Sequence, residues 1–115
     1  MTGGAPRETH LARWRIVEVP HRLGLHRRMF GEKQGGGWRI SSPIVEETGA
    51  WVRTQSGGLY HKDGVEMETL GEPDLQVLAY FMEKEGFDRR STLFILALAL
   101  AENPNHPGKE GSRDH

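Results

Sequence analysis

Arginines that alternate with aromatic residues give the clearest chemical signal in the sequence, in the segments 13–15 (RWR), 38–39 (WR) and 51–53 (WVR). Aromatic rings can stack on bases while guanidinium groups contact phosphates, so this combination is typical of nucleic-acid binding. Side chains alternate between the two faces of a β-strand. We therefore expect Trp14 and Trp38 to point into the core, and the arginines beside them to point into solvent.

Only Trp51 and Arg53 are spaced to share one face of a strand. With three arginines from the first part of the chain, they form the candidate nucleic-acid surface: Trp51, Arg53, Arg22, Arg27 and Arg28. Residues 1–40 carry eight basic and three acidic residues, a net charge of +5, whereas the remainder carries seven and thirteen, a net charge of −6. The acidic remainder weakens phosphate contacts. Nucleic-acid binding is therefore the alternative interpretation.

Metal ligands in this chain would have to be histidine or acidic residues, because it has no cysteine. The candidates are His21, His26, His61, Asp63, His106 and His115. No histidine pair has the helical i, i+4 spacing or the short-turn spacing that prepares a zinc site. His61 and Asp63 lie two apart and would share one face of a strand end, as a polar surface pair. We expect no metal site and no cofactor.

No local pattern of a catalytic site is present. The glycine-rich segment 31–37 lacks the Gly-Lys-Ser/Thr ending of a P-loop and leads into an expected strand rather than a helix, so we interpret it as a hairpin loop. No nucleophile stands beside a base, and Ser41-Ser42 and Glu46-Glu47 are interpreted as turn and surface residues. We expect a protein that is not an enzyme and takes no small-molecule substrate. A catalytic site built from residues far apart in the sequence stays an open alternative.

Short β-strands are predicted for the first half of the chain. Residues 12–19 alternate between apolar and polar and predict a half-buried strand that Pro20 ends. Further strands are expected at residues 25–30, 38–40, 50–54 and 59–61. The strand at 38–40 is expected to be interrupted at Pro43 and to resume at Ile44 and Val45. Turns are expected at Thr48-Gly49 and at residues 55–58. Five closely spaced strands over residues 12–61 favour a bent antiparallel sheet or a small SH3-like barrel.

Two helices are predicted after the composition changes at Gly64. Pro73 and Asp74 start an amphipathic helix over residues 74–85, and Gly86 ends it. Asp88 caps a second helix over residues 90–101, which Asn103-Pro104 ends.

The second helix is apolar on every side, whereas a surface helix normally keeps a polar face toward water. It is about half the length of roughly 20 residues that spans a bilayer, so we expect no membrane segment. Two interpretations remain open. The helix lies in the centre of the fold between the sheet and the first helix, or it forms an interface with a second copy or another protein. The interface candidates are Leu93, Phe94, Leu96 and Leu100.

The stretch Ile40-Ser-Ser-Pro-Ile-Val45, followed by Val52-Arg-Thr-Gln-Ser-Gly57, Tyr60 and Leu70-Gly71, resembles a pattern in short uncharacterised bacterial and prophage open reading frames. That pattern runs approximately T-S-P-I-V, then V-R-T-R-S-G-S-x-Y-x-L-G. Here a glycine replaces the second serine of the S-G-S element, and residues 61–69 intervene before Leu-Gly. The resemblance carries over no catalytic residue and suggests a mobile-element origin.

Together these patterns predict one α+β domain over residues 11–102, between disordered tails at residues 1–10 and 103–115. The chain lacks a basic and apolar leader at its start, so we expect a cytoplasmic protein. The preferred function is that of a small, non-catalytic accessory protein that binds another protein or itself.

Overall fold

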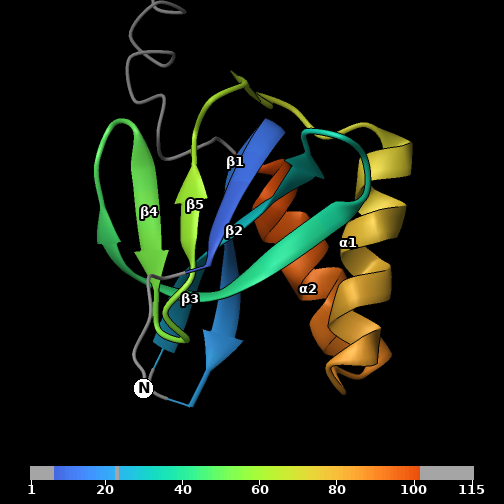
Figure 1. Ribbon diagram of the computed structural model, residues 1–115. Helices are drawn as coiled ribbons and strands as arrows, with labels where there is room; N and C mark the ends of the chain where they lie inside the picture. Colours follow the sequence, from blue (N-terminus) through green and yellow to red (C-terminus); the bar gives the residue numbers. More distant parts are fainter. Residues whose placement is uncertain (1–6, 23, 102–115) are drawn as a thin grey trace, which may run out of the picture. The chain divides into compact units, whose positions relative to one another are not determined.

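The computed structural model describes residues 7–22 and 24–101 of the 115-residue chain (Figure 1). The chain divides into two compact units after Met67. The strand unit holds β1 (Glu8–His21), β2 (Gly24–Lys33), β3 (Trp38–Glu47), β4 (Trp51–Thr54), β5 (Leu59–His61) and β6 (Val65–Glu66). The helix unit holds α1 (Glu72–Lys84) and α2 (Arg89–Leu100). The predicted α+β class is confirmed.

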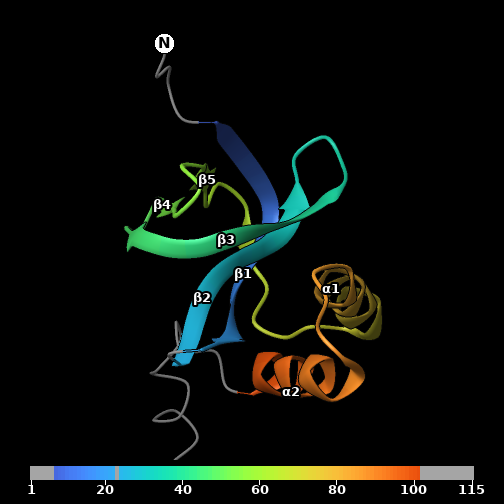
Figure 2. The same cartoon turned by 90° about the horizontal axis from the view of Figure 1, so that it is seen from below.

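The strand unit is one mixed sheet of six strands in the order β2-β3-β4-β5-β1-β6. Strand β1 also pairs with β2, so the first five strands form a closed ring. The long strand β1 makes this closure. Its residues 8–10 pair in parallel with β5, and its residues 11–21 pair antiparallel with β2. Figure 2 shows the curvature of β2 and β3 that the ring requires.

Strand β1 is longer than the sequence indicated. It begins at Glu8 rather than Ala12, so residues 8–10, which the composition assigned to a tail, belong to the sheet. Pro20 does not end the strand. It pairs with Leu25 one residue before the strand finishes, where a missing backbone N–H costs little. The short strand β6 was not predicted.

Pro43 does not interrupt β3, contrary to the expectation from sequence. The pairing of β3 with β2 shifts register between Ile40 and Pro43, as at a β-bulge, which lets a sheet accommodate proline. At this shift the buried Ser41 hydroxyl accepts a hydrogen bond from the Met29 N–H at 2.8 Å and donates one to the Ser42 carbonyl oxygen at 2.6 Å. Ser41 was predicted to be a surface residue, but it completes the hydrogen bonding of the sheet.

Two glycines allow backbones to approach closely. A Cβ atom added to Gly31 would stand 2.1 Å from the Arg13 carbonyl oxygen, and one added to Gly64 would stand 1.8 Å from the Ala12 carbonyl oxygen. Any side chain at either position would displace β1. Because Gly31 lies within β2, the predicted hairpin loop at 31–37 is confined to residues 34–37.

Both predicted turns between the later strands are present. The Thr48 hydroxyl accepts hydrogen bonds from the N–H groups of Ala50 and Trp51, at 3.1 and 3.0 Å, and so shapes the turn from β3 to β4. Gly57 takes a positive φ of 95° in the turn from β4 to β5. These local signals therefore set the hairpins correctly.

The core of the strand unit draws on four strands and consists of Leu11, Trp14, Ile16, Met29, Val52 and Tyr60. The burial of Trp14 is as expected. Trp38 is only half-buried, and its ring stacks on Phe30 with the centroids 5.2 Å apart. The Arg13 guanidinium carbon lies 5.2 Å from the centroid of the Trp38 ring.

Arg15 is not solvated, contrary to the expectation from strand alternation. It is 2% exposed, and its Nη1 donates a hydrogen bond to the Met67 carbonyl oxygen at 2.9 Å. Burial lowers the pKa of Arg15, and the nearby Glu66 carboxylate opposes that shift. Residues that follow β5 come back beside β1, because β6 pairs with Arg13 and Trp14. Trp14 and Arg15 take opposite faces of β1 and are both buried, so both faces of the strand are covered at this point.

The helix unit follows its predicted signals, although α1 begins at Glu72, two residues before the predicted start at Asp74. Asp74 accepts a hydrogen bond from the Gly71 N–H at 2.9 Å at the start of α1. Gly86 takes a positive φ of 100° and ends α1, with the Phe87 N–H bonded to the Met82 carbonyl oxygen at 3.1 Å. Asp88 caps α2 by accepting the Ser91 N–H at 2.8 Å. The two helices pack against each other, and Figures 1 and 2 show them side by side.

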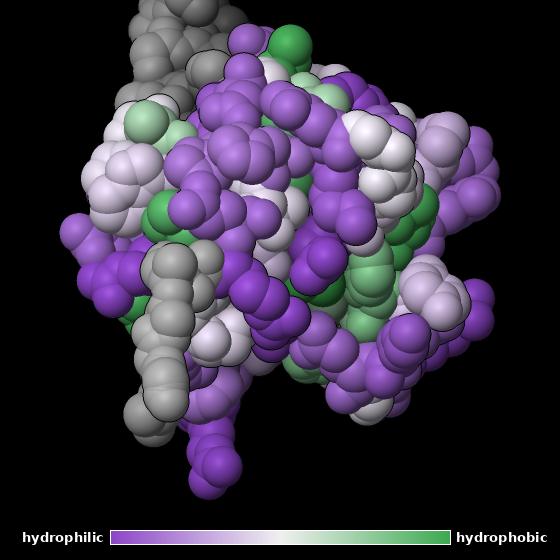
Figure 3. Space-filling model, viewed as in Figure 1, coloured by the Kyte–Doolittle hydropathy of each residue, from purple (hydrophilic) through white to green (hydrophobic). Residues whose placement is uncertain are grey.

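The surface that Figure 3 displays is mostly hydrophilic, and apolar side chains appear in it as small separate areas. Within residues 7–22 and 24–101, no helix has both the length and the hydropathy needed to cross a membrane.

Candidate interaction surface and polar clusters

Helix α2 exposes one apolar stripe. Leu93 is 55% exposed, Phe94 50% and Leu100 59%, and Ala97 is exposed between them. Positions 93, 97 and 100 follow the helical repeat, so they lie along one side. We call Leu93, Phe94, Ala97 and Leu100 the α2 stripe.

The other side of α2 is buried through Thr92, Ile95 and Ala99. Of the four predicted interface residues, the structure thus brings Leu93, Phe94 and Leu100 to the surface, while Leu96 is partly buried. The interpretation in which α2 is enclosed on every side does not hold for the α2 stripe.

The charges of α2 are unevenly placed along its axis. The helix begins with Arg89 and Arg90, its first turn holds no acidic residue and its last turn holds no basic one. Positive side chains at a helix N-terminus oppose the helix dipole. Asp88 compensates in part, and the hydrogen bonds from the backbone and side chain of Ser91 lower the pKa of its carboxyl group.

The nucleic-acid candidates Trp51 and Arg53 lie on β4 with the spacing that places them on one face. Trp51 is half-buried and pairs in register with His61. The Arg53 guanidinium is held by the Glu46 carboxylate on β3, through Nε at 3.0 Å and through Nη2. A phosphate would have to displace that carboxylate.

The remaining candidate arginines are on or beside the β1–β2 hairpin. Arg22 is exposed next to the turn, and Arg28 is partly buried on β2. Arg27 forms an ion pair with Glu47, Nη1 to Oε1, at 2.6 Å, and Lys62 binds the other oxygen of the same carboxylate at 3.0 Å. Carboxylates of β3 therefore neutralise charge at two of the four candidate arginines.

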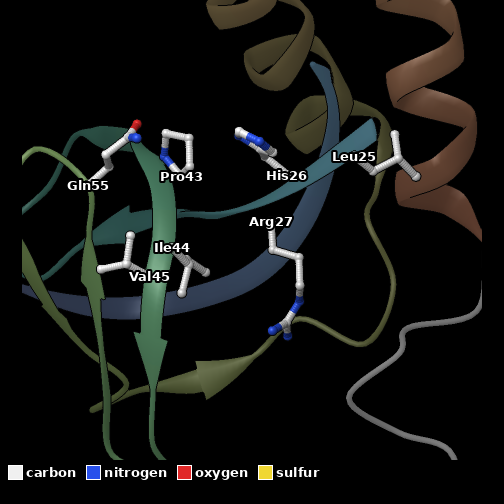
Figure 4. Close-up of a pocket in the computed structure, with 7 residues that line it drawn as sticks. All are labelled: Leu25, His26, Arg27, Pro43, Ile44, Val45 and Gln55. Carbon is white, nitrogen blue, oxygen red and sulfur yellow. The ribbon is translucent and has the colours of Figure 1, made fainter. Parts of the chain in front are cut away.

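A hollow of about 380 Å³ opens between β2 and β3 (Figure 4). It is lined by Leu25, His26, Arg27, Pro43, Ile44, Val45 and Gln55. Its one charged lining residue is Arg27, which the ion pair to Glu47 already engages. Its other polar lining residues are His26 and Gln55.

A polar cluster that the sequence did not predict lies where β1 meets β5. Glu8 and His10 of β1 are near His61 of β5, and one ligand atom of each lies within 4.8 Å of the others. His61 Nε2 is 2.9 Å from Glu8 Oε1, and His10 Nδ1 is bonded to the Asp63 carboxylate. The two imidazole rings stack with centroids 4.2 Å apart.

The signal for this cluster was present as Glu-x-His at residues 8–10 and His-x-Asp at residues 61–63. Both are spaced to share one face of a strand. The helical and short-turn spacings typical of zinc sites do not include ligands that two paired strands bring together. Residues 8–10 had also been assigned to a tail.

A second histidine pair provides a contrast. His21 and His26, at the β1–β2 hairpin, stack with ring centroids 4.0 Å apart. The described contacts show no carboxylate bonded to either ring, and His26 Nδ1 is buried without a hydrogen-bond partner.

No protein-family model, no curated protein and no solved structure matches this chain, so its function is inferred from its own residues.

Proposed function

We propose that the protein is a non-catalytic binding protein that associates through the α2 stripe, and that the occupant is the same stripe of a second copy. The observation that carries this proposal is the run of exposed apolar side chains along one side of α2. Exposed apolar surface is lost when two such helices pack, and the release of water drives the association.

An antiparallel arrangement of the two α2 helices suits the charges of this helix. It would place Arg89 and Arg90 of each copy beside the C-terminal end of the other helix, where the dipole is negative. Leu93 of one copy would then lie near Leu100 of the other. The small Ala97 at the centre would let the helices approach closely. This is a two-fold interface, in which the same surface meets itself.

The size of the α2 stripe limits the strength of association. Three half-exposed large side chains and an alanine offer roughly 300 Å² per copy, compared with about 800 Å² per partner in a stable interface. We therefore expect a weak dimer whose population depends on concentration.

Sedimentation velocity over a concentration series would test this proposal on the full chain. We expect the wild type to shift from monomer toward dimer, and Leu93→Glu or Leu100→Glu to remain monomeric. Val65→Glu is the matched control, because Val65 is an even more exposed apolar residue outside α2 and its replacement should leave the dimer unchanged.

Circular dichroism would show whether each variant keeps its helix content. If Leu93→Glu unfolds, Ala97→Glu changes the same stripe at a smaller side chain. A wild type that stays monomeric at every concentration, or stripe variants that dimerise like the wild type, would refute self-association.

The alternative function, nucleic-acid binding, has weaker support because Glu46 and Glu47 engage Arg53 and Arg27. A salt titration with single- and double-stranded oligonucleotides would test it. Binding at low salt that Trp51→Ala weakens would favour this alternative, and no binding at low salt would remove it.

A further inference from the structure

The parallel pairing of β1 with β5 brings Glu8, His10 and His61 together on one face of the sheet, and Asp63, just after β5, is bonded to His10. His10 lies directly opposite His61 in the register. Glu8 stands two residues before His10, and Asp63 stands two residues after His61. The alternate residues Tyr60 and Leu11 belong to the core on the opposite face. The strand pairing thus fixes the backbone under Glu8, His10 and His61.

We propose that Glu8, His10 and His61 bind a divalent transition-metal ion of the zinc class, with Asp63 orienting His10. Two imidazole nitrogens and one carboxylate oxygen are ligands that zinc uses, and three protein ligands leave a position open for water. The ligand atoms lie within 4.8 Å of one another, and rotation of the side chains, including the stacked imidazole rings, would bring them onto one ion.

The partner of His10 resembles the outer shell of a metal site. Its Nδ1 is bonded to the Asp63 carboxylate, and a donated Nδ1–H leaves Nε2 with the lone pair that a metal takes. A carboxylate bonded to the far nitrogen of a metal-bound imidazole fixes the ring orientation. His61 Nε2 and Glu8 Oε1, now 2.9 Å apart, would both turn to the ion.

The charge of the cluster also favours a cation. The cluster contains two carboxylates, which attract a cation, and its side chains are partly exposed, so an ion can enter from solvent. Lys62 does not neutralise it, because its ammonium group is bound to Glu47 and the Thr48 carbonyl oxygen. Lys33 and Arg39 line the hollow beside Glu8 and His10 and oppose the cation, which limits its affinity.

Isothermal titration calorimetry of the full chain with ZnCl₂ and with MgCl₂ would test the site. We expect one zinc ion per chain at this site. Binding should weaken at least tenfold in His10→Ala and in His61→Ala. Mg²⁺ should not bind detectably, since it prefers oxygen ligands. Co²⁺ should give a visible absorption spectrum typical of nitrogen and oxygen ligation.

The isosteric variants Glu8→Gln and Asp63→Asn keep the test valid if an alanine variant fails to fold. Asp63→Asn should weaken zinc binding about 10- to 100-fold, as loss of an outer-shell partner does. His21→Ala is the matched control, because it removes one histidine of the other stacked pair and should leave zinc affinity unchanged. The absence of micromolar zinc binding, or a His10→Ala variant that binds zinc like the wild type, would overturn the proposal.

Discussion

At the register shift in β3, the Ser41 hydroxyl serves as the hydrogen-bond acceptor for a backbone N–H of β2. It accepts a hydrogen bond from the buried Met29 N–H and donates one to the Ser42 carbonyl oxygen. A buried N–H without a partner is costly. Ser41 is therefore a structural residue.

Replacement of Ser41 by alanine should lower the free energy of unfolding by about 1–3 kcal/mol, because the Met29 N–H would be left unsatisfied. Urea denaturation would measure the loss. Ser42→Ala removes a hydroxyl bonded to the Ser56 hydroxyl and N–H at an exposed position, where water can replace it, so its cost should be only about 0.5 kcal/mol. Equal losses in the two variants would contradict the role assigned to Ser41.

Arg15 shows why side-chain alternation alone misjudged this residue. Alternation assigns Arg15 to the face opposite Trp14, and the sequence predicted water there. That face is instead covered, and the Met67 carbonyl oxygen accepts the guanidinium N–H. Alternation tells which face a residue takes, but what lies on that face depends on segments far along the chain.

At the scale of the strands, the backbones of β1 and β2 lie so close together at residue 31 that only glycine fits there. Gly31→Ala should lower the free energy of unfolding by about 3 kcal/mol, the upper end for overpacking, because the new Cβ would meet the Arg13 carbonyl oxygen at 2.1 Å. Gly49 has open space at its Cβ position. Gly49→Ala should therefore change stability by less than about 0.5 kcal/mol. Comparable losses in urea denaturation would show that the β1–β2 contact is not strained.

At the scale of the helices, the cap of α2 should make its stability depend on pH. The hydrogen bonds from Ser91 lower the pKa of Asp88 below its ordinary value of 3.8. A carboxyl group whose pKa is depressed by folding contributes stability above its unfolded pKa, and this contribution is lost as the pH falls through the folded pKa.

Asp88→Ala should therefore lower the thermal unfolding midpoint at neutral pH, and the difference from the wild type should shrink in acid. Asp88→Asn keeps a capping oxygen without a titrating charge, so its midpoint should fall less and its deficit should vary less with pH. A wild-type advantage over Asp88→Ala that persists unchanged in strong acid would show that the carboxylate does not act as the cap.

At the scale of the whole molecule, the two proposed sites share no residue and no secondary-structure element. The α2 stripe belongs to the helix unit and the zinc ligands to the strand unit. Effects at independent sites add. Leu93→Glu should leave zinc affinity unchanged, and saturating zinc should leave the dimer dissociation constant unchanged. Calorimetry on the variant and sedimentation with zinc would reveal any coupling between the sites.

The sequence by itself determined what depends on neighbouring residues. Gly86 ended α1 and Asp88 capped α2 as predicted, since capping involves contacts within one turn, whereas α1 began at Glu72, two residues before the predicted start. Five of the strands were predicted near their observed positions, since alternation and turn residues are local signals. Leu93, Phe94, Leu96 and Leu100 were singled out from sequence as interface candidates, and their role in an interface stays a prediction.

The tertiary structure decided what depends on pairing between distant segments. The ring closes because β1 pairs with both β2 and β5, and the cluster of Glu8, His10, His61 and Asp63 exists only in that register. Segments some fifty residues apart meet there, as the 53-residue separation of His10 and Asp63 shows. No local sequence pattern predicts this pairing, because the backbone N–H and C=O groups of a strand can bond to any strand that the whole fold places beside it.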